Sequence, residues 1–158
     1  MMTSDRSLLQ KALKLWRHFS AGLDLLQPAA ALAARLYVGQ VFFLSGLTKL
    51  RDWGTTVALF TDEYRVPLLS PVIAAFMGTA GELVLPVLLV LGLAGRFSAL
   101  GLFVVNAVAV ISLSEIAPAA LQQHVFWGAL LAGLAIYGVG SWSLDRWLAP
   151  RLRHGQDM

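Results

Sequence analysis

The chain contains no cysteine and few charged residues. Without cysteine, none of its 158 residues can form a disulfide, a thiol redox centre, an iron–sulfur cluster or a cysteine zinc site. Charged residues make up 13% of the chain, about half the roughly 25% of soluble domains, whereas 58% of the residues are hydrophobic. A soluble protein of this length needs more polar surface. The composition therefore argues against a soluble enzyme or a nucleic-acid-binding domain and indicates a protein embedded in lipid.

Four apolar stretches are long enough to cross a bilayer, over residues 28–47, 71–93, 97–113 and 123–140. Crossing about 30 Å of hydrocarbon takes roughly 20 helical residues, and the last two stretches need their flanks to reach both interfaces. The stretches are continuously apolar rather than alternating, which favours helices over a β-barrel. We therefore predict an all-α integral membrane four-helix bundle over residues 28–142.

The segment before the first span, residues 1–27, has a helical pattern of its own. Between residues 8 and 26, leucine and aromatic side chains recur at helical spacing, with Lys11, Lys14 and Arg17 on the other side. Such a pattern predicts a basic amphipathic helix lying on an anionic membrane surface. A soluble helix packed on a partner is the alternative. Residues 143–158 form a second flanking segment, a polar tail.

A short helix is also expected between spans one and two. Asp52 is a suitable N-cap, and Pro67 ends the segment. The apolar residues between them recur at helical spacing: Trp53, Val57, Phe60 and Tyr64. We predict a helix lying in the membrane interface with this side inward. The short segment 94–96 predicts a tight turn that makes spans two and three an antiparallel hairpin.

The distribution of lysine and arginine predicts the orientation. With four spans, eight of these residues fall on the side of both termini and the 94–96 turn, and three fall on the other side. Because lysine and arginine accumulate on the cytoplasmic side, both termini are expected in the cytoplasm.

Two charged residues lie inside the predicted spans, Arg35 in the first and Glu82 in the second. A charge at mid-bilayer costs about 2.5–3.5 kcal/mol on insertion scales, so such residues usually face the protein interior and have a partner. We predict a buried Arg35–Glu82 ion pair, with Lys49 ending the helical stripe on which Arg35 lies. Snorkelling of Arg35 to the headgroups is the alternative.

Four further polar residues are weaker candidates for an accessory role: Asn106, His124, Glu115 and Tyr64. A hydrogen bond between helices is the more common role for a residue such as Asn106 in span three, and simple solvation at the interface is the more common state of residues such as His124 and Glu115. The three histidines are far apart in the sequence, so no metal site is expected.

Several of these residues occur in an order that resembles the DoxX family of small bacterial membrane proteins. The resemblance covers roughly residues 30–142 and is carried by Arg35, Gly39, Phe42–Lys49, Phe60, Tyr64–Pro67, Gly81–Leu83 and Leu91–Arg96. It implies a four-helix protein of the bacterial inner membrane. Some family members resemble subunits of a thiosulfate:quinone oxidoreductase or a terminal quinol oxidase, and others are implicated in redox or detoxification complexes. The family's polar positions correspond here to Arg35, Lys49 and Glu82.

Three functions are compatible with these observations. The first is an accessory or anchor subunit of a quinone-linked membrane redox complex, without a catalytic centre or cofactor of its own. The second is a small transporter or proton pathway, which would have to form a homo-oligomer because four helices enclose little volume. The third is a structural scaffold in which the polar residues only fix helix packing. The resemblance favours the first.

Overall fold

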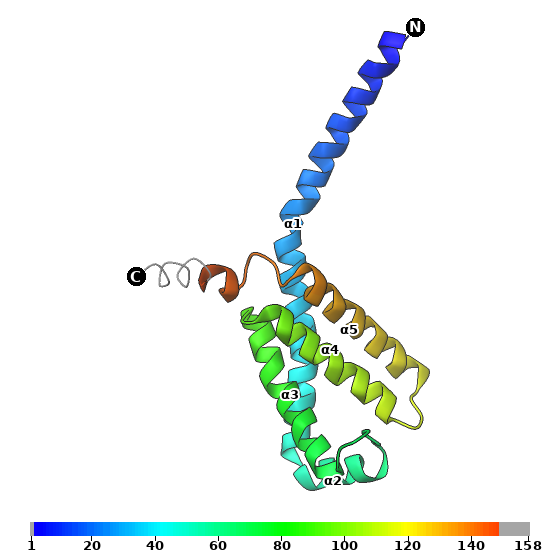
Figure 1. Ribbon diagram of the computed structural model, residues 1–158, viewed down its shortest axis with the longest axis vertical. Helices are drawn as coiled ribbons and strands as arrows, with labels where there is room; N and C mark the ends of the chain where they lie inside the picture. The colour runs from blue at the N-terminus through cyan, green and yellow to red at the C-terminus, as the bar shows by residue number, and fades with distance from the viewer. Residues whose placement is uncertain (1, 149–158) are drawn as a thin grey trace.

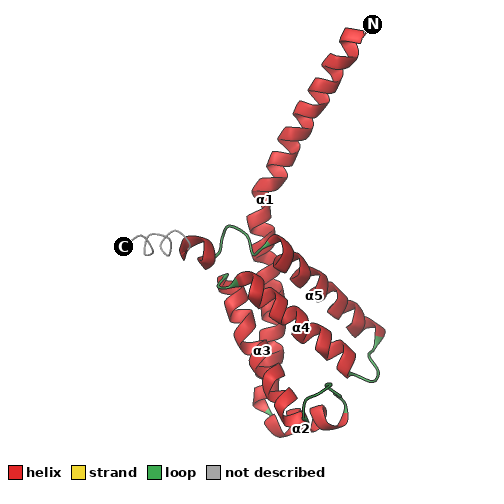
Figure 2. Cartoon of the chain, viewed as in Figure 1, coloured by secondary structure: helices red, strands yellow, loops and turns green. Residues whose placement is uncertain are grey.

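The computed structural model describes residues 2–148, and the side chains from residue 10 onward (Figure 1). Five helices account for most of these residues, and loops and turns join them (Figure 2). The helices are α1 (Met2–Arg51), α2 (Trp53–Asp62), α3 (Pro71–Leu91), α4 (Gly95–Ser112) and α5 (Pro118–Tyr137). Four of them, all except the short α2, are long and apolar enough to cross a membrane. The chain is therefore a multi-pass, all-α membrane protein, as predicted.

The first helix is much longer than the span it contains. At 1.5 Å per residue, the 50 residues of α1 extend over about 75 Å, more than twice the hydrocarbon thickness. Its N-terminal half projects beyond the other helices (Figure 1). The helix predicted over residues 8–26 is confirmed, but it continues into the first span instead of forming a separate helix. Pro28, expected at the start of that span, lies inside α1.

The remaining elements follow the predicted order with shifted boundaries. α3 and α4 lie close to the predicted spans 71–93 and 97–113, and a turn at Gly92–Ala94 joins them as an antiparallel hairpin. Both Gly92 and Ala94 adopt positive φ angles, 68° and 46°. α5 starts at Pro118, five residues before the predicted boundary, because a proline in the first helical turn costs no hydrogen bond.

The helix predicted between the first two spans is confirmed as α2. The side chain of Asp52 accepts a hydrogen bond from the backbone N–H of Thr55 and so caps the helix start, as expected. Phe60 is buried against Ala74 and Ala75 of α3, which holds α2 across that end of the bundle.

Two glycines of α1 set how closely α1 and α3 approach. A Cβ atom on Gly39 would lie 2.6 Å from the side chain of Val90, and one on Gly46 would lie 2.9 Å from Leu83. Small residues allow helices in membranes to pack this closely. The two helices are antiparallel, and Gly46 lies opposite Glu82 and Leu83.

Residues 138–148 fold back over the end of the bundle from which the N-terminal half of α1 projects (Figure 1). The carboxylate of Asp145 accepts hydrogen bonds of 2.9 Å from the backbone N–H groups of both Ala94 and Gly95. These N–H groups stand at the start of α4, where no helical acceptor is available to them. Asp145 therefore caps α4 from a distant part of the chain.

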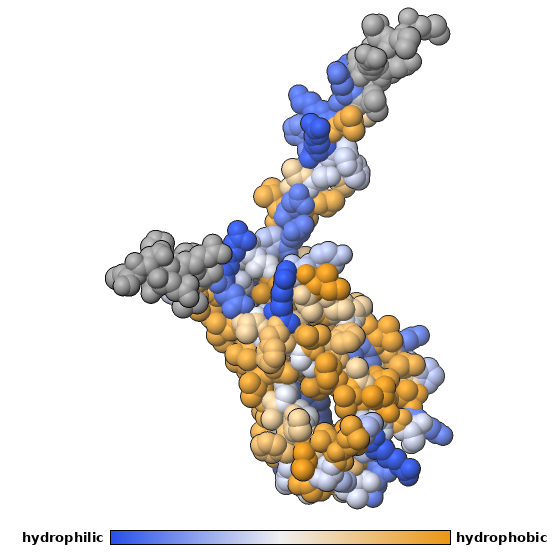
Figure 3. Space-filling model, viewed as in Figure 1, coloured by the Kyte–Doolittle hydropathy of each residue, from blue (hydrophilic) through white to orange (hydrophobic). Residues whose placement is uncertain are grey.

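Apolar side chains dominate the surface of the bundle, and hydrophilic ones gather on the projecting part of α1 and at the opposite end (Figure 3). The buried core is formed by side chains from all four long helices and the segment after α5: Val38, Phe42, Leu89, Ala99, Leu102, Leu131, Leu134 and Val139. The apolar surface of the bundle agrees with the membrane-spanning position that the helix lengths indicate.

Candidate functional site

Glu82, near the middle of α3, forms an ion pair with Lys49 near the end of α1. The Nζ atom of Lys49 lies 2.5 Å from Oε2 of Glu82, and it also donates a 3.0 Å hydrogen bond to Oγ of Ser45 one turn earlier. Glu82 is 7% exposed, whereas the side chain of Lys49 is 20% exposed. A buried carboxylate is thus neutralised by a cation that keeps partial access to the surroundings.

The predicted ion pair between Arg35 and Glu82 is wrong. A Cβ atom on Gly92 would lie 2.5 Å from Nη1 of Arg35, so the guanidinium packs against the C-terminal end of α3. Glu82 lies ten residues before Gly92, which corresponds to about 15 Å along the helix. Because α1 and α3 are antiparallel with Gly46 opposite Glu82, Lys49 reaches the carboxylate and Arg35 does not.

Arg35 is instead held at the other end of the bundle. It is 1% exposed, and its Nη2 atom donates a 2.5 Å hydrogen bond to the carbonyl oxygen of Trp142. Its Nε and Nη1 atoms are buried without a hydrogen-bond partner. The C-terminal carbonyl groups of α3 carry a partial negative charge that favours a cation there. Arg35 therefore joins α1 to the end of α3 and to the folded-back tail.

The Lys49–Glu82 pair lies in the wall of a cavity of 610 Å³. The cavity is enclosed by side chains of α1, α3, α4 and α5 together with α2 and the loop after it, and most of them are apolar. The polar or aromatic residues among them are Phe42, Ser45, Lys49, Phe60, Tyr64, Glu82, Ser112, His124 and Trp127. A cavity of this size, with apolar walls and a few polar groups, suits a small organic molecule.

Asn106 and His124 contact each other in the same region. The amide nitrogen of Asn106 donates a 2.9 Å hydrogen bond to the backbone oxygen of His124, and its Oδ1 lies 2.8 Å from Nδ1 of that histidine. Since the amide oxygen only accepts, Nδ1 carries the proton in the neutral imidazole and Nε2 is left as an acceptor. His124 lines the cavity, so its imidazole is a candidate hydrogen-bond acceptor there.

Tyr64 is placed in the cavity by the loop after α2. Its ring stacks on Phe60 at 5.0 Å between centroids, and the next residue, Arg65, donates a 2.8 Å backbone hydrogen bond to Ser112 at the end of α4. Burial raises the pKa of Tyr64 above its ordinary value of 10.0, and the negative charges of Glu82 and Glu63 raise it further. The hydroxyl group therefore stays protonated, and it has no hydrogen-bond partner among the described residues.

Of the residues selected from the sequence, the structure gathers Lys49, Glu82, Tyr64 and His124 around one cavity, with Asn106 behind His124. Arg35 lies at the opposite end, and Glu115 is exposed in the loop between α4 and α5. Ser45 and Trp127 were missed. Ser45 lies one turn before Lys49 on the same helix face, a spacing that could have identified it.

Comparison with known families gives one informative result. The family model described as DoxX matches residues 30–115, which include Arg35, Lys49, Tyr64, Glu82 and Asn106. The matched region ends before α5, so His124 lies outside it. No curated protein and no solved structure gives a significant match to the chain.

Proposed function

Because the chain belongs to the DoxX family of membrane proteins, we propose that it is an accessory subunit of a quinone-linked redox complex of the bacterial inner membrane and that its cavity binds the quinone. The observation that carries this proposal is the 610 Å³ cavity with apolar walls and the Lys49–Glu82 pair, Tyr64 and His124 in its lining. Both termini are taken to lie in the cytoplasm, as the lysine and arginine distribution predicts.

The polar groups of the cavity suit both forms of a quinone. The carbonyl oxygens of the oxidised form accept hydrogen bonds, for which the Lys49 ammonium and the Tyr64 hydroxyl are donors. The hydroxyl groups of the reduced form donate hydrogen bonds, for which Glu82 and Nε2 of His124 are acceptors. The apolar walls suit an isoprenoid tail. A bound quinone would supply two-electron redox chemistry, while this chain positions the ring.

An accessory role is proposed because the electrons must come from elsewhere. The chain has no cysteine that could hold an iron–sulfur cluster or exchange electrons as a thiol pair. We therefore place the electron-transferring centre on a partner subunit. A scaffold would not need a cavity. A transporter would need a path across the whole bundle, whereas this cavity lies toward the Lys49 end. We therefore prefer the accessory subunit to both alternatives.

Quinone binding can be measured directly in lipid nanodiscs. Trp127 lines the cavity, so titration with a short-chain ubiquinone or menaquinone analogue should quench tryptophan fluorescence saturably, and the Trp127→Phe variant should lose that component. Glu82→Gln should weaken binding about tenfold or more, since hydrogen bonds to charged groups contribute about 1.5–3 kcal/mol. Glu115→Gln, a carboxylate outside the cavity, is the matched control and should bind as the unmodified chain does.

Copurification tests whether the protein belongs to a redox complex. The protein should copurify from its native membrane in mild detergent with a quinone reductase activity that Glu82→Gln lowers and Glu115→Gln leaves unchanged. Absence of saturable quinone binding in the folded protein would refute the cavity's proposed role. Proton flux in liposomes that contain only this protein, above the flux in empty liposomes, would instead support the alternative of a proton pathway.

A further inference from the structure

Along the membrane span, the face of α1 opposite the bundle is uncovered, and beyond the bundle nearly every residue of α1 from Gln10 to Gln27 is exposed. Between residues 16 and 47, ten exposed residues follow one another at alternating spacings of three and four. In order they are Trp16, Phe19, Leu23, Leu26, Ala30, Ala33, Tyr37, Gln40, Leu44 and Leu47. Seven of the ten are purely apolar, and Trp16, Tyr37 and Gln40 carry a polar group. We call this face the α1 seam.

The spacing of the α1 seam has a specific meaning. Alternation of three and four is the heptad repeat, in which the first and fourth positions of each seven residues face a partner helix in a coiled coil. In an isolated straight helix, such a stripe would drift by about 20° per heptad, so a strict repeat over 32 residues favours pairing of two helices. Lys14, Arg17, His18 and Asp24 all fall outside the heptad positions that face or flank a partner.

Four of the ten residues of the α1 seam lie beyond the bundle. The segment with Trp16, Phe19, Leu23 and Leu26 belongs to the projecting part of α1, and no other described element accompanies it (Figure 1). α1 continues without interruption from the membrane span into this segment. A straight continuation of the span leads away from the bilayer, in contrast to the membrane-surface position predicted from the sequence. Lipid therefore does not cover these large apolar side chains, which calls for a protein helix running beside α1.

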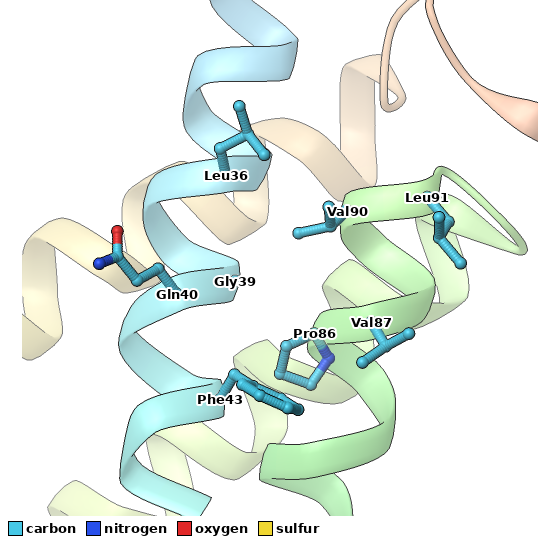
Figure 4. A pocket seen from close by; sticks show the side chains of 8 residues that line it. All are labelled: Leu36, Gly39, Gln40, Phe43, Pro86, Val87, Val90 and Leu91. Carbon is cyan, nitrogen blue, oxygen red and sulfur yellow. The ribbon is translucent and has the colours of Figure 1, made fainter. Parts of the chain in front are cut away.

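Gln40 indicates which helix that is. Its side chain is exposed within the membrane span and makes no hydrogen bond among the described residues. Its carboxamide points away from α3, beside a groove of 380 Å³ between α1 and α3 (Figure 4). Lipid tails offer it no partner. A carboxamide has both a donor and an acceptor, so two copies of Gln40 satisfy each other across a two-fold axis.

We propose that two copies of this chain pair in parallel through the α1 seam, from Trp16 to Leu47. Two copies inserted with the same orientation necessarily present their α1 helices in parallel, and the two-fold axis lies along the membrane normal. Each seam residue except Tyr37, whose ring packs on Phe126 of its own α5, then faces its counterpart, and the Gln40 pair fixes the register, as single polar residues do in coiled coils. The dimer is independent of the cavity and of its ligand.

The absence of cysteine makes the test direct, because a single introduced cysteine can be cross-linked without background. Leu26 belongs to the seam and is 60% exposed, whereas its neighbour Leu25 is 81% exposed and lies off the seam. In proteoliposomes under mild oxidation, Leu26→Cys should form at least about fivefold more disulfide-linked dimer than Leu25→Cys, since a disulfide needs Cα atoms within about 7 Å. Leu44→Cys should behave like Leu26→Cys inside the membrane.

A second set of variants tests the energetics by single-molecule counting or Förster transfer in nanodiscs and vesicles. Gln40→Leu should weaken dimerisation by about threefold, the typical contribution of one hydrogen bond between membrane helices. Leu23→Glu should abolish the dimer by placing like charges in the seam, whereas Leu25→Glu should not. A monomer at every protein-to-lipid ratio, or equal cross-linking at positions 25 and 26, would overturn the proposal. So would burial of Leu26 in lipid, reported by a polarity-sensitive label on Leu26→Cys.

Discussion

Two cations on one stripe of α1 have opposite surroundings. Lys49 pairs with a carboxylate in the wall of a cavity, and its side chain remains 20% exposed. Arg35, fourteen residues earlier, is 1% exposed and bonds to a backbone carbonyl of the folded-back tail. Both residues satisfy the rule that a charge in an apolar span faces the protein interior. Only the cation that reaches a cavity is available to a ligand.

The difference arises from which part of α3 lies opposite each cation. The Lys49 end of α1 lies opposite the middle of α3, where Glu82 provides a full negative charge. The Arg35 end lies beside Gly92, where α3 terminates and its last carbonyl groups carry only partial charges. Under the proposed function, Lys49 belongs to the binding site, whereas Arg35 belongs to the framework that holds the helices together.

The largest effect on stability is expected for Arg35→Ala. The substitution removes a large buried side chain and leaves the Trp142 carbonyl without its donor, so the free energy of unfolding should fall by about 4 kcal/mol. Unfolding in mixed micelles of increasing SDS content would measure the loss. The fraction of the Arg35→Ala protein that remains folded should bind quinone with unchanged affinity. Loss of binding with unchanged stability would reverse the roles assigned to the two cations.

Glu82→Leu should lower the free energy of unfolding somewhat less, by about 3 kcal/mol, which is the lower limit for breaking a buried ion pair. The loss stays at this limit because Lys49 can turn toward its partly exposed side. The double variant Lys49→Met/Glu82→Leu should recover most of that stability, since two apolar side chains replace the pair. It should not recover quinone binding. A double variant that binds quinone normally would show that the pair only stabilises the fold.

At the Arg35 end, Asp145→Ala should lower the free energy of unfolding by about 1–2 kcal/mol, because two backbone N–H groups at the start of α4 lose their acceptor. Asp145→Asn, which keeps one side-chain oxygen, should have an intermediate effect. The same micelle titration measures both variants. An unchanged midpoint for Asp145→Ala would show that the tail does not contribute to closing this end.

The smallest expected effect is the pH dependence of the cap at Asp52, near the Lys49 end. Hydrogen bonds from the backbone N–H and the hydroxyl group of Thr55 lower the pKa of Asp52 below its ordinary value of 3.8. The folded state thus favours the ionised carboxylate, so its contribution to stability is present above the unfolded pKa and disappears as the pH falls through the folded pKa. The stability difference between the unmodified chain and Asp52→Asn should therefore shrink on acidification. A difference that stays constant with pH would contradict this.

Much of the fold could be predicted from the sequence, because span lengths and the cap at Asp52 are local properties. The continuity of α1 through Pro28 was missed, since a proline after a polar segment is typical of a helix start. The partner of Glu82 was also missed. It depends on how far α1 is shifted along α3, and close packing at Gly39 and Gly46 decides that shift. The contact between Asn106 and His124 depends in the same way on the pairing of α4 with α5.

The most direct test of the central claim is photoaffinity labelling with an azido-quinone in lipid nanodiscs, followed by peptide mass spectrometry. We expect labelling of the cavity segments that contain Lys49, Tyr64 and His124, suppressed by excess unmodified quinone. Labelling concentrated around Arg35 and Gly92, or labelling that excess quinone does not suppress, would contradict the assignment of the Lys49–Glu82 cavity as the binding site.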